Sequence, residues 1–207
     1  MTAFPAADTG ARDVVADSFS RHRATLDGLL QDLAGSVARL DGWASLLHER
    51  LSAGHRLLVA GNGGSAAQAQ HLAAELVGRF RSDRPAFSAV ALTADSVTIT
   101  ALANDYGVNE MFARQVEAHG RDGDVLLALS TSGRSPNLLR AVEAACQVGL
   151  VTVALTGARP NPLSDAVHDA VVVGSSDTAL IQEAHQVLIH LLCEAFDARV
   201  FTAEGVR

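Results

Sequence analysis

The residues best suited to proton chemistry are His71 and Glu75, four positions apart in the stretch AQAQHLAAEL. On a helix this spacing places both side chains on one face, close enough to share a proton or a metal ion. Their neighbours are mostly Ala and Leu, so the alternative explanation is an ordinary exposed His–Glu pair.

A second set of polar groups lies in a largely apolar stretch near the end of the chain, DTALIQEAHQVLIHLLCEAF (177–196). Gln182 and His190 are eight positions apart, about 12 Å along a helix axis, so they reach one ligand only through extended side chains. For the histidines of this stretch, His185 and His190, we expect buried rings whose nitrogens are hydrogen-bonded.

A glycine-rich loop follows the first apolar strand, in LLVAGNGGSAAQAQH (57–71). Its glycines let the backbone approach a ligand closely, and the helix that follows presents free N–H groups. This arrangement suits a phosphate or sugar hydroxyls, although a tight strand-to-helix turn would also use some of these glycines. The loop residues are Gly61, Asn62, Gly63, Gly64 and Ser65.

A serine-rich loop follows another apolar strand, in VLLALSTSGRSPNLL (125–139). The pair Ser135–Pro136 predicts a helix N-cap and first helical residue, which alone would explain that serine. The other hydroxyls, crowded at a helix start, suit phosphate oxygens. The four hydroxyl residues are Ser130, Thr131, Ser132 and Ser135.

The elements that must position these loops alternate between strands and helices from His55 onward. Five short apolar strands separated by helices predict an α/β fold with a parallel sheet covered on both faces. We expect strands at 57–60, 88–92, 125–129, 150–155 and 170–173, helices at 66–80, 96–103, 110–118, 136–148 and 178–197, and a surface loop at 158–165.

The segment 11–53 is predicted to be helical before the sheet begins, with a break near Gly35. It packs either against another subunit or over its own domain, and the spacing of its apolar residues does not choose between them. We expect one domain over 11–207, preceded by a flexible segment 1–10.

Charge and hydropathy exclude several classes of function. The net charge is −7 and no run of Lys or Arg occurs, which argues against nucleic-acid binding. No apolar stretch is long enough to span a membrane, and no secretory signal is recognised, so we expect a cytoplasmic protein. Accordingly, Cys146 and Cys193 are expected to be reduced, buried thiols.

Four segments together resemble the sugar isomerase (SIS) domain family and, within it, its phosphoheptose isomerase branch. They are AGNGGSAAQAQHLAAELVGRF, ALANDYG, GDVLLALSTSGRS and IQEAHQVLIH. The resemblance implies a three-layer αβα sandwich around a five-stranded parallel sheet. It also implies a homotetramer whose active sites lie at subunit interfaces.

The resemblance further implies roles for individual residues. Glu75 matches the catalytic base and His190 its acid/base partner. Zinc is implied as a cofactor, one ion per subunit, with His71, Glu75, Gln182 and His190 as ligands. The resemblance also implies substrate contacts, which it places at Asn62, Gly63, Gly64 and Ser65 of the glycine-rich loop, at Glu75, at the pair Asn104 and Asp105, at Gln182, and at the phosphate cradle of Ser130, Thr131, Ser132 and Ser135.

The implied reaction interconverts sedoheptulose 7-phosphate and D-glycero-D-manno-heptose 7-phosphate through an enediol. The alternative is a non-catalytic SIS protein that binds the bacterial replication initiator, a branch that lacks the acid and the histidine found here at Glu75 and His190. The chain departs from the family pattern at Gln68, at Arg134, which we expect to face solvent, and over 158–165.

Overall fold

The predicted parallel sheet is present in the computed structural model, which describes residues 9–203. All neighbouring strands are parallel, in the order β2-β1-β3-β4-β5. This confirms the predicted fold class, with each strand within two residues of its expected bounds. The strands are β1 Leu57–Gly61, β2 Ala89–Ala91, β3 Val125–Ser130, β4 Val151–Thr156 and β5 Asp169–Val172.

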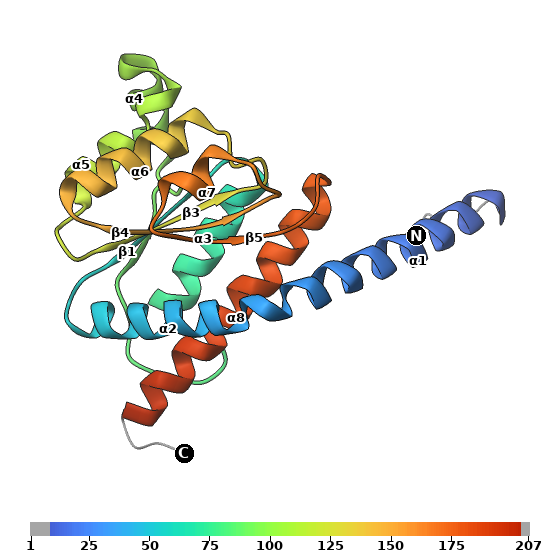
Figure 1. Ribbon diagram of the computed structural model, residues 1–207. Coiled ribbons are helices and arrows are strands. Elements are labelled where there is room, and N and C mark those ends of the chain that lie inside the picture. Colours follow the sequence, from blue (N-terminus) through green and yellow to red (C-terminus); the bar gives the residue numbers. More distant parts are fainter. Residues whose placement is uncertain (1–8, 204–207) are drawn as a thin grey trace, which may run out of the picture.

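Alternating side chains of the sheet feed two apolar cores, one on each face. Leu57 and Val59 of β1 join one core, whereas Leu58 and Ala60 join the other. The first core is closed by α2 Val37–Ser52, α3 Gly64–Val77 and α8 Thr178–Ala203. The second is closed by α5 Ala113–His119, α6 Pro136–Val148 and α7 Pro162–Ala166 (Figure 1). The sheet is therefore the middle of three layers.

The N-terminal segment forms two helices, α1 Thr9–Asp32 and α2, joined by a 3-10 turn at Leu33–Ser36 that contains the predicted break. The later part of α1 packs on the core, but its outer part extends away from the body (Figure 1). Most of the predicted flexible segment 1–10 lies outside the described residues, and the single domain over 11–207 stays a prediction.

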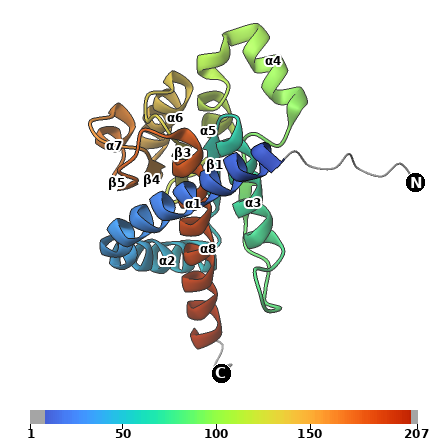
Figure 2. The ribbon, with the colours of Figure 1, turned by 90° about the vertical axis from the view of Figure 1, so that its right-hand side faces the viewer.

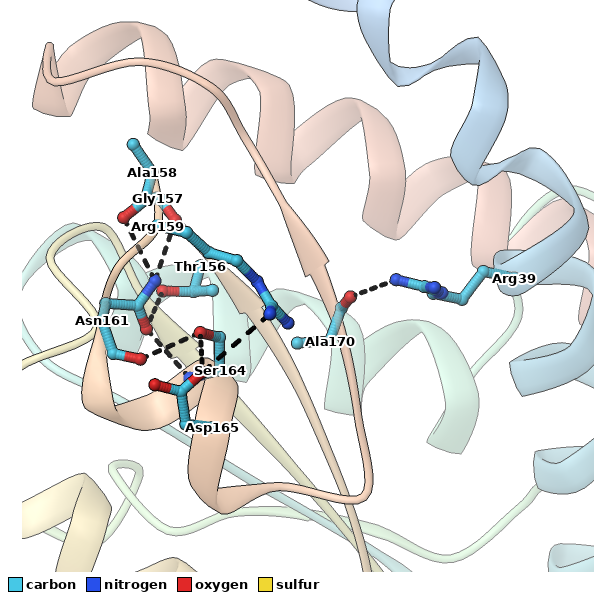
Figure 3. Close-up of polar contacts among 9 residues, drawn as sticks. All are labelled: Arg39, Thr156, Gly157, Ala158, Arg159, Asn161, Ser164, Asp165 and Ala170. Carbon is cyan, nitrogen blue, oxygen red and sulfur yellow. Dashed lines mark hydrogen bonds and ion pairs between the residues drawn. The ribbon is translucent and has the colours of Figure 1, made fainter.

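The predicted surface loop 158–165 is partly wrong, because it contains α7. Asn161, 2% exposed, accepts a hydrogen bond from Ser164 N at 2.9 Å, and Pro162 follows as the first helical residue. The Asn161 amide also donates to the carbonyls of Gly157 and Ala158 (Figure 3). Asn followed by Pro is a helix-start signal that we interpreted only as a loop signal.

Both cysteines are free, as expected. Cys193 is buried on α8, but Cys146 is exposed on α6, so the prediction of two buried thiols is wrong at Cys146. Cys146 lies on the outer side of α6, away from the residues of that helix that enter the core. Among the described helices, none is both long and apolar enough to cross a membrane.

Candidate active site

The two polar loops meet where the strand order reverses. The chain leaves β1 toward β2 on one side, whereas β4 and β5 follow β3 on the other. Ligands of open α/β sheets bind outside the carboxyl ends of the strands at this switch point. Asn62, after β1, and Asn137, in α6 after β3, exchange amide hydrogen bonds of 3.0 and 2.9 Å. The two loops are therefore tied directly to each other.

The glycine-rich loop is packed against the last helix. A Cβ atom on Gly64 would lie 2.6 Å from Nε2 of Gln182, so only a glycine leaves room for that side chain. The Gln182 carbonyl in turn accepts a 2.7 Å hydrogen bond from the Gln68 amide. The structure thus brings Gln182 to the predicted substrate loop, and Gln68, a departure from the family pattern, helps to hold it there.

A cavity of about 190 Å³ opens beside the glycine-rich loop. Its wall combines loop backbone and apolar side chains from the segments after β2, a composition typical of small-molecule sites. The lining residues are Gly61, Asn62, Gly63, Ala66, Thr93, Ile99, Met111 and Phe112. Of the predicted substrate contacts, Asn62 and Gly63 line this cavity, whereas Ser65 is 3% exposed and turned into the protein.

The four hydroxyls of the second loop are not equivalent. Ser130 is 4% exposed, and its Oγ accepts a 3.0 Å hydrogen bond from Gly133 N. The Oγ of Ser132 accepts from Arg134 N at 3.2 Å. Ser135 is the N-cap residue of α6, as predicted, but its side chain makes no capping hydrogen bond. The hydroxyls of Thr131 and Ser135 are therefore the best placed to meet a ligand.

Segment 157–163 clamps the second loop from outside. Gly133 has φ +60°, and a Cβ atom there would lie 2.0 Å from Oδ1 of Asn161. The carbonyl of Gly133 also accepts from Leu163 N at 3.0 Å. Arg134 is exposed, as expected, and its guanidinium also donates to the carbonyl of Pro160 at 2.8 Å. The loop conformation thus depends on a segment that the motifs do not include.

The predicted proton-transfer residues meet on two facing helices. On α3, Nε2 of His71 lies 3.2 Å from Oε1 of Glu75. The same nitrogen lies 3.1 Å from Nε2 of His190 on α8. Gln186 supports His190 through a 2.9 Å contact from its amide to the same ring nitrogen. The Glu75 carboxyl is largely buried, with a side-chain exposure of 21%, whereas the His71 ring is 43% exposed.

Asn104 and Asp105 lie on α4 Ser96–Tyr106, a helix without a buried residue that stands off the body (Figures 1 and 2). Their side chains are exposed, and Nδ2 of Asn104 donates to Oδ1 of Asp105 at 2.9 Å. The structure therefore presents this pair at the surface rather than among the proton-transfer residues.

The predicted zinc ligands supply suitable donor types but do not form an assembled site. His71, Glu75 and His190 are in contact, but the side chain of Gln182 lies against Gly64. Over residues 9–203 there is no group of three or more His, Cys, Asp or Glu side chains arranged to hold a metal ion.

Sequence reasoning missed Asn137, a buried polar residue near the site, and was only partly right about His185. Asn137 carries no motif signal except its place after Ser135 and Pro136. His185 is fully buried on α8 and, within the described part of the chain, neither of its ring nitrogens has a hydrogen-bond partner. The predicted burial of His185 is confirmed, whereas the predicted hydrogen bonding of its ring is not found among the described residues. Burial lowers its pKa to about 4, against a smaller opposing effect of the Thr156 backbone.

Comparisons with known proteins agree with this geometry. The SIS domain family model matches residues 21–157. A phosphoheptose isomerase of Streptomyces coelicolor is 58% identical over 162 residues, which cover 78% of this chain and 70% of that protein. One from Bradyrhizobium sp. (strain BTAi1) is 46% identical over 190 residues, covering 91% and 94% of the two chains.

Solved structures extend the similarity to three dimensions. The phosphoheptose isomerase GmhA from Neisseria gonorrhoeae superimposes with a TM-score of 0.81 at 37% identity. The match covers 91% of this chain and 99% of that one.

Proposed function

Because this chain belongs to the SIS domain family, we propose that it works as a phosphoheptose isomerase. It is a ketose–aldose isomerase that interconverts sedoheptulose 7-phosphate and D-glycero-D-manno-heptose 7-phosphate. The similarity to phosphoheptose isomerases of other bacteria, at 58% and 46% identity, supports this assignment. Neither those relatives nor the site geometry favours the replication-initiator alternative.

The observation that carries the mechanism is the contact of His71 with both Glu75 and His190. Isomerisation moves a proton between carbon 1 and carbon 2 of the sugar through an enediol. In our proposal the Glu75 carboxylate takes the proton from one carbon and returns it to the other. His190 exchanges a proton with the neighbouring oxygen as charge develops there, and His71 holds the two groups together.

Substrate binding is assigned to the two loops at the switch point. The hydroxyls of Thr131 and Ser135, with the N-terminal N–H groups of α6, suit the phosphate at one end of the sugar. Gln182 and the glycine-rich loop suit sugar hydroxyls. Anchoring the phosphate fixes the far end of the sugar. The free energy of phosphate binding thereby helps to align the reacting carbons with the proton-transfer residues.

Zinc binding and assembly are separate parts of the proposal. His71, Glu75, Gln182 and His190 would hold one Zn²⁺ per subunit, which would polarise a substrate oxygen; this needs Gln182 to turn away from Gly64. A homotetramer with shared active sites would cover the exposed apolar residues of α1 and bring α4 of one subunit to the loops of another. A cytoplasmic location agrees with two free thiols.

The decisive experiment follows purified protein and sedoheptulose 7-phosphate by NMR in D₂O, with and without added Zn²⁺. We expect conversion to the aldose, with deuterium at carbon 2 in those turnovers in which the proton on Glu75 exchanges with solvent before it is returned, and loss of conversion in Glu75→Gln and His190→Gln. Glu117→Gln, an exposed glutamate of α5, is the matched control and should keep wild-type turnover. Absence of turnover by the wild type under both conditions would remove the proposed function.

Metal analysis of protein purified without chelators tests the zinc proposal separately. We expect about one zinc ion per subunit, and full activity of a metal-free preparation would contradict it. Sedimentation analysis tests the tetramer in the same way, because a monomer at assay concentration would exclude active sites shared between subunits.

A further inference from the structure

Arg84 is a buried cation in the segment between α3 and β2. Its side chain is 1% exposed, and its Nε lies 2.7 Å from Oδ1 of Asp197 on α8, whose side chain is 8% exposed. Burying a guanidinium is costly unless its donors are paired. Neither residue belongs to the candidate site described above, so the role of this buried ion pair needs another explanation.

The guanidinium joins the end of α3 to α8. Its Nη2 donates to the backbone carbonyl of Glu75 at 2.6 Å, and its Nη1 donates to the carbonyls of Leu76 at 3.0 Å and Pro85 at 2.9 Å. The last carbonyls of a helix lack intrahelical partners, and the helix dipole favours a cation there. Arg84 therefore caps the turn that carries Glu75 while its Nε is bonded to Asp197.

Two aromatic rings fix the plane of the guanidinium. Its central carbon lies 5.4 Å from the ring centroid of Phe87 and 5.6 Å from that of Phe196. The rings pack edge to face, with centroids 4.9 Å apart and an interplanar angle of 88°. A guanidinium group held in this way can donate to several fixed acceptors at once. The ammonium group of a lysine cannot match this geometry.

The partners of Arg84 lie on the same two helices as the proton-transfer residues. The Glu75 turn is bonded directly, and Asp197 follows His190 on α8 by seven residues, about two helical turns, so both lie on the same side of α8. We propose that Arg84 is a positioning residue, which sets the Glu75 carboxylate against the His190 imidazole by locking α3 to α8. This inference rests on the proposed roles of Glu75 and His190.

The test separates positioning from folding. Arg84→Met alone strands a buried carboxylate, so we combine it with Asp197→Leu, since replacing both charges of a buried pair by apolar groups often preserves stability. Arg84→Lys is the second variant, because it keeps the charge but not the fork. For both we expect kcat to fall roughly 10- to 100-fold, as small misplacements of reacting groups do, with KM changed less than about threefold.

A matched control removes an exposed ion pair between the same two segments. Arg81 and Glu194 lie 3.1 Å apart with side chains 68% and 53% exposed. The double variant Arg81→Gln, Glu194→Gln should keep wild-type kcat. Wild-type kcat in Arg84→Lys, or in a folded Arg84→Met, Asp197→Leu protein, would overturn the positioning role.

Hydrogen exchange supplies a readout that does not depend on catalysis. We expect the amides of residues 72–77 to exchange faster in both Arg84 variants than in the wild type and the Arg81 control. If the wild type has no isomerase activity but the Arg84 variants still exchange faster, the proposed function is wrong, whereas the role of Arg84 in holding α3 to α8 is supported. Equal exchange rates in all four proteins would show that Arg84 does not hold α3 to α8, whatever the activity.

Discussion

The Nε2 atoms of His71 and His190 lie 3.1 Å apart, although 119 positions separate these residues in the sequence. Because His71 also contacts Glu75, it is the group that connects the carboxylate to the second imidazole. In the proposed mechanism, the proton-transfer side chains therefore all come from one chain.

The first prediction concerns that connecting histidine. His71→Asn should lower kcat roughly 10- to 100-fold, because Glu75 and His190 keep their chemistry but lose the side chain that aligns them. Glu75→Gln should cost more, on the order of 1000-fold, because the proton acceptor itself is lost. Steady-state kinetics measures both. His119→Asn, an exposed histidine of α5, is the control, and equal kcat values for His71→Asn and the wild type would contradict the connecting role.

The second prediction separates phosphate binding from proton transfer. Thr131→Ala and Ser135→Ala should each raise KM roughly 10-fold with little change in kcat, because a hydrogen bond to a charged group contributes about 1.5 to 3 kcal/mol. Ser176→Ala, an exposed serine before α8, should leave KM unchanged. A fall in kcat at constant KM for both loop variants would place these hydroxyls at the reacting carbons instead.

The motifs predicted the loops and their neighbourhood because these features depend on local sequence. Strand, glycine turn and helix follow one another in the chain, so the loop after β1 and the loop after β3 were found from spacing alone. Parallel strands with connecting helices then bring both loops to one edge of the sheet. The five strands and the break near Gly35 were predicted for the same reason.

The remaining parts of the site depend on contacts between distant segments, which spacing does not encode. The Asn62–Asn137 amide pair, the packing of Gln182 on Gly64 and the burial of Arg84 each join segments at least eight residues apart. Arg84 lies in a stretch with no periodic pattern, so nothing local marks it as buried. Arg84 follows the end of α3 by seven residues, but only the folded chain shows that its side chain returns to the last carbonyls of that helix.

The third prediction concerns the glycine at the tip of the serine-rich loop. Gly133→Ala should destabilise the protein by at least about 2 kcal/mol, because the residue has φ +60° and its Cβ atom would overlap Asn161. It should also raise KM by displacing the neighbouring hydroxyls. Gly42→Ala on α2 is the matched control, since nothing lies within 4 Å of its Cβ position, and it should stabilise by about 0.5 to 1 kcal/mol. Denaturant unfolding measures both, and similar values for the two would contradict the clamp by Asn161.

The fourth prediction concerns assembly through α1. Val14, Val15 and Phe19 are 65%, 68% and 66% exposed on the part of this helix that leaves the body (Figure 1). If the proposed tetramer forms through α1, Phe19→Glu should lower the mass found by sedimentation analysis, because a charge would enter an apolar interface. Ala24→Glu places the same charge on the opposite face of the helix and should leave the mass unchanged. Equal masses for both variants and the wild type would exclude α1 from the interface.

The fifth prediction concerns the pH dependence of stability through His185. Burial lowers its pKa from 6.5 to about 4, so between these values the unfolded chain binds a proton that the folded chain does not. The free energy of unfolding should therefore fall as the pH drops from about 6.5 to 4, by roughly 3 kcal/mol from this residue, and this contribution should level off below pH 4.

His185→Leu should remove that part of the pH dependence, because no proton uptake distinguishes its folded and unfolded states at this position. The exposed His119→Leu should retain the wild-type slope, since its ring meets solvent in both states. Urea unfolding at several pH values from 7 to 4 gives the slopes directly. Parallel curves for wild type and His185→Leu would mean that the buried ring finds a partner or a water in solution, and that its neutral form is not enforced by burial.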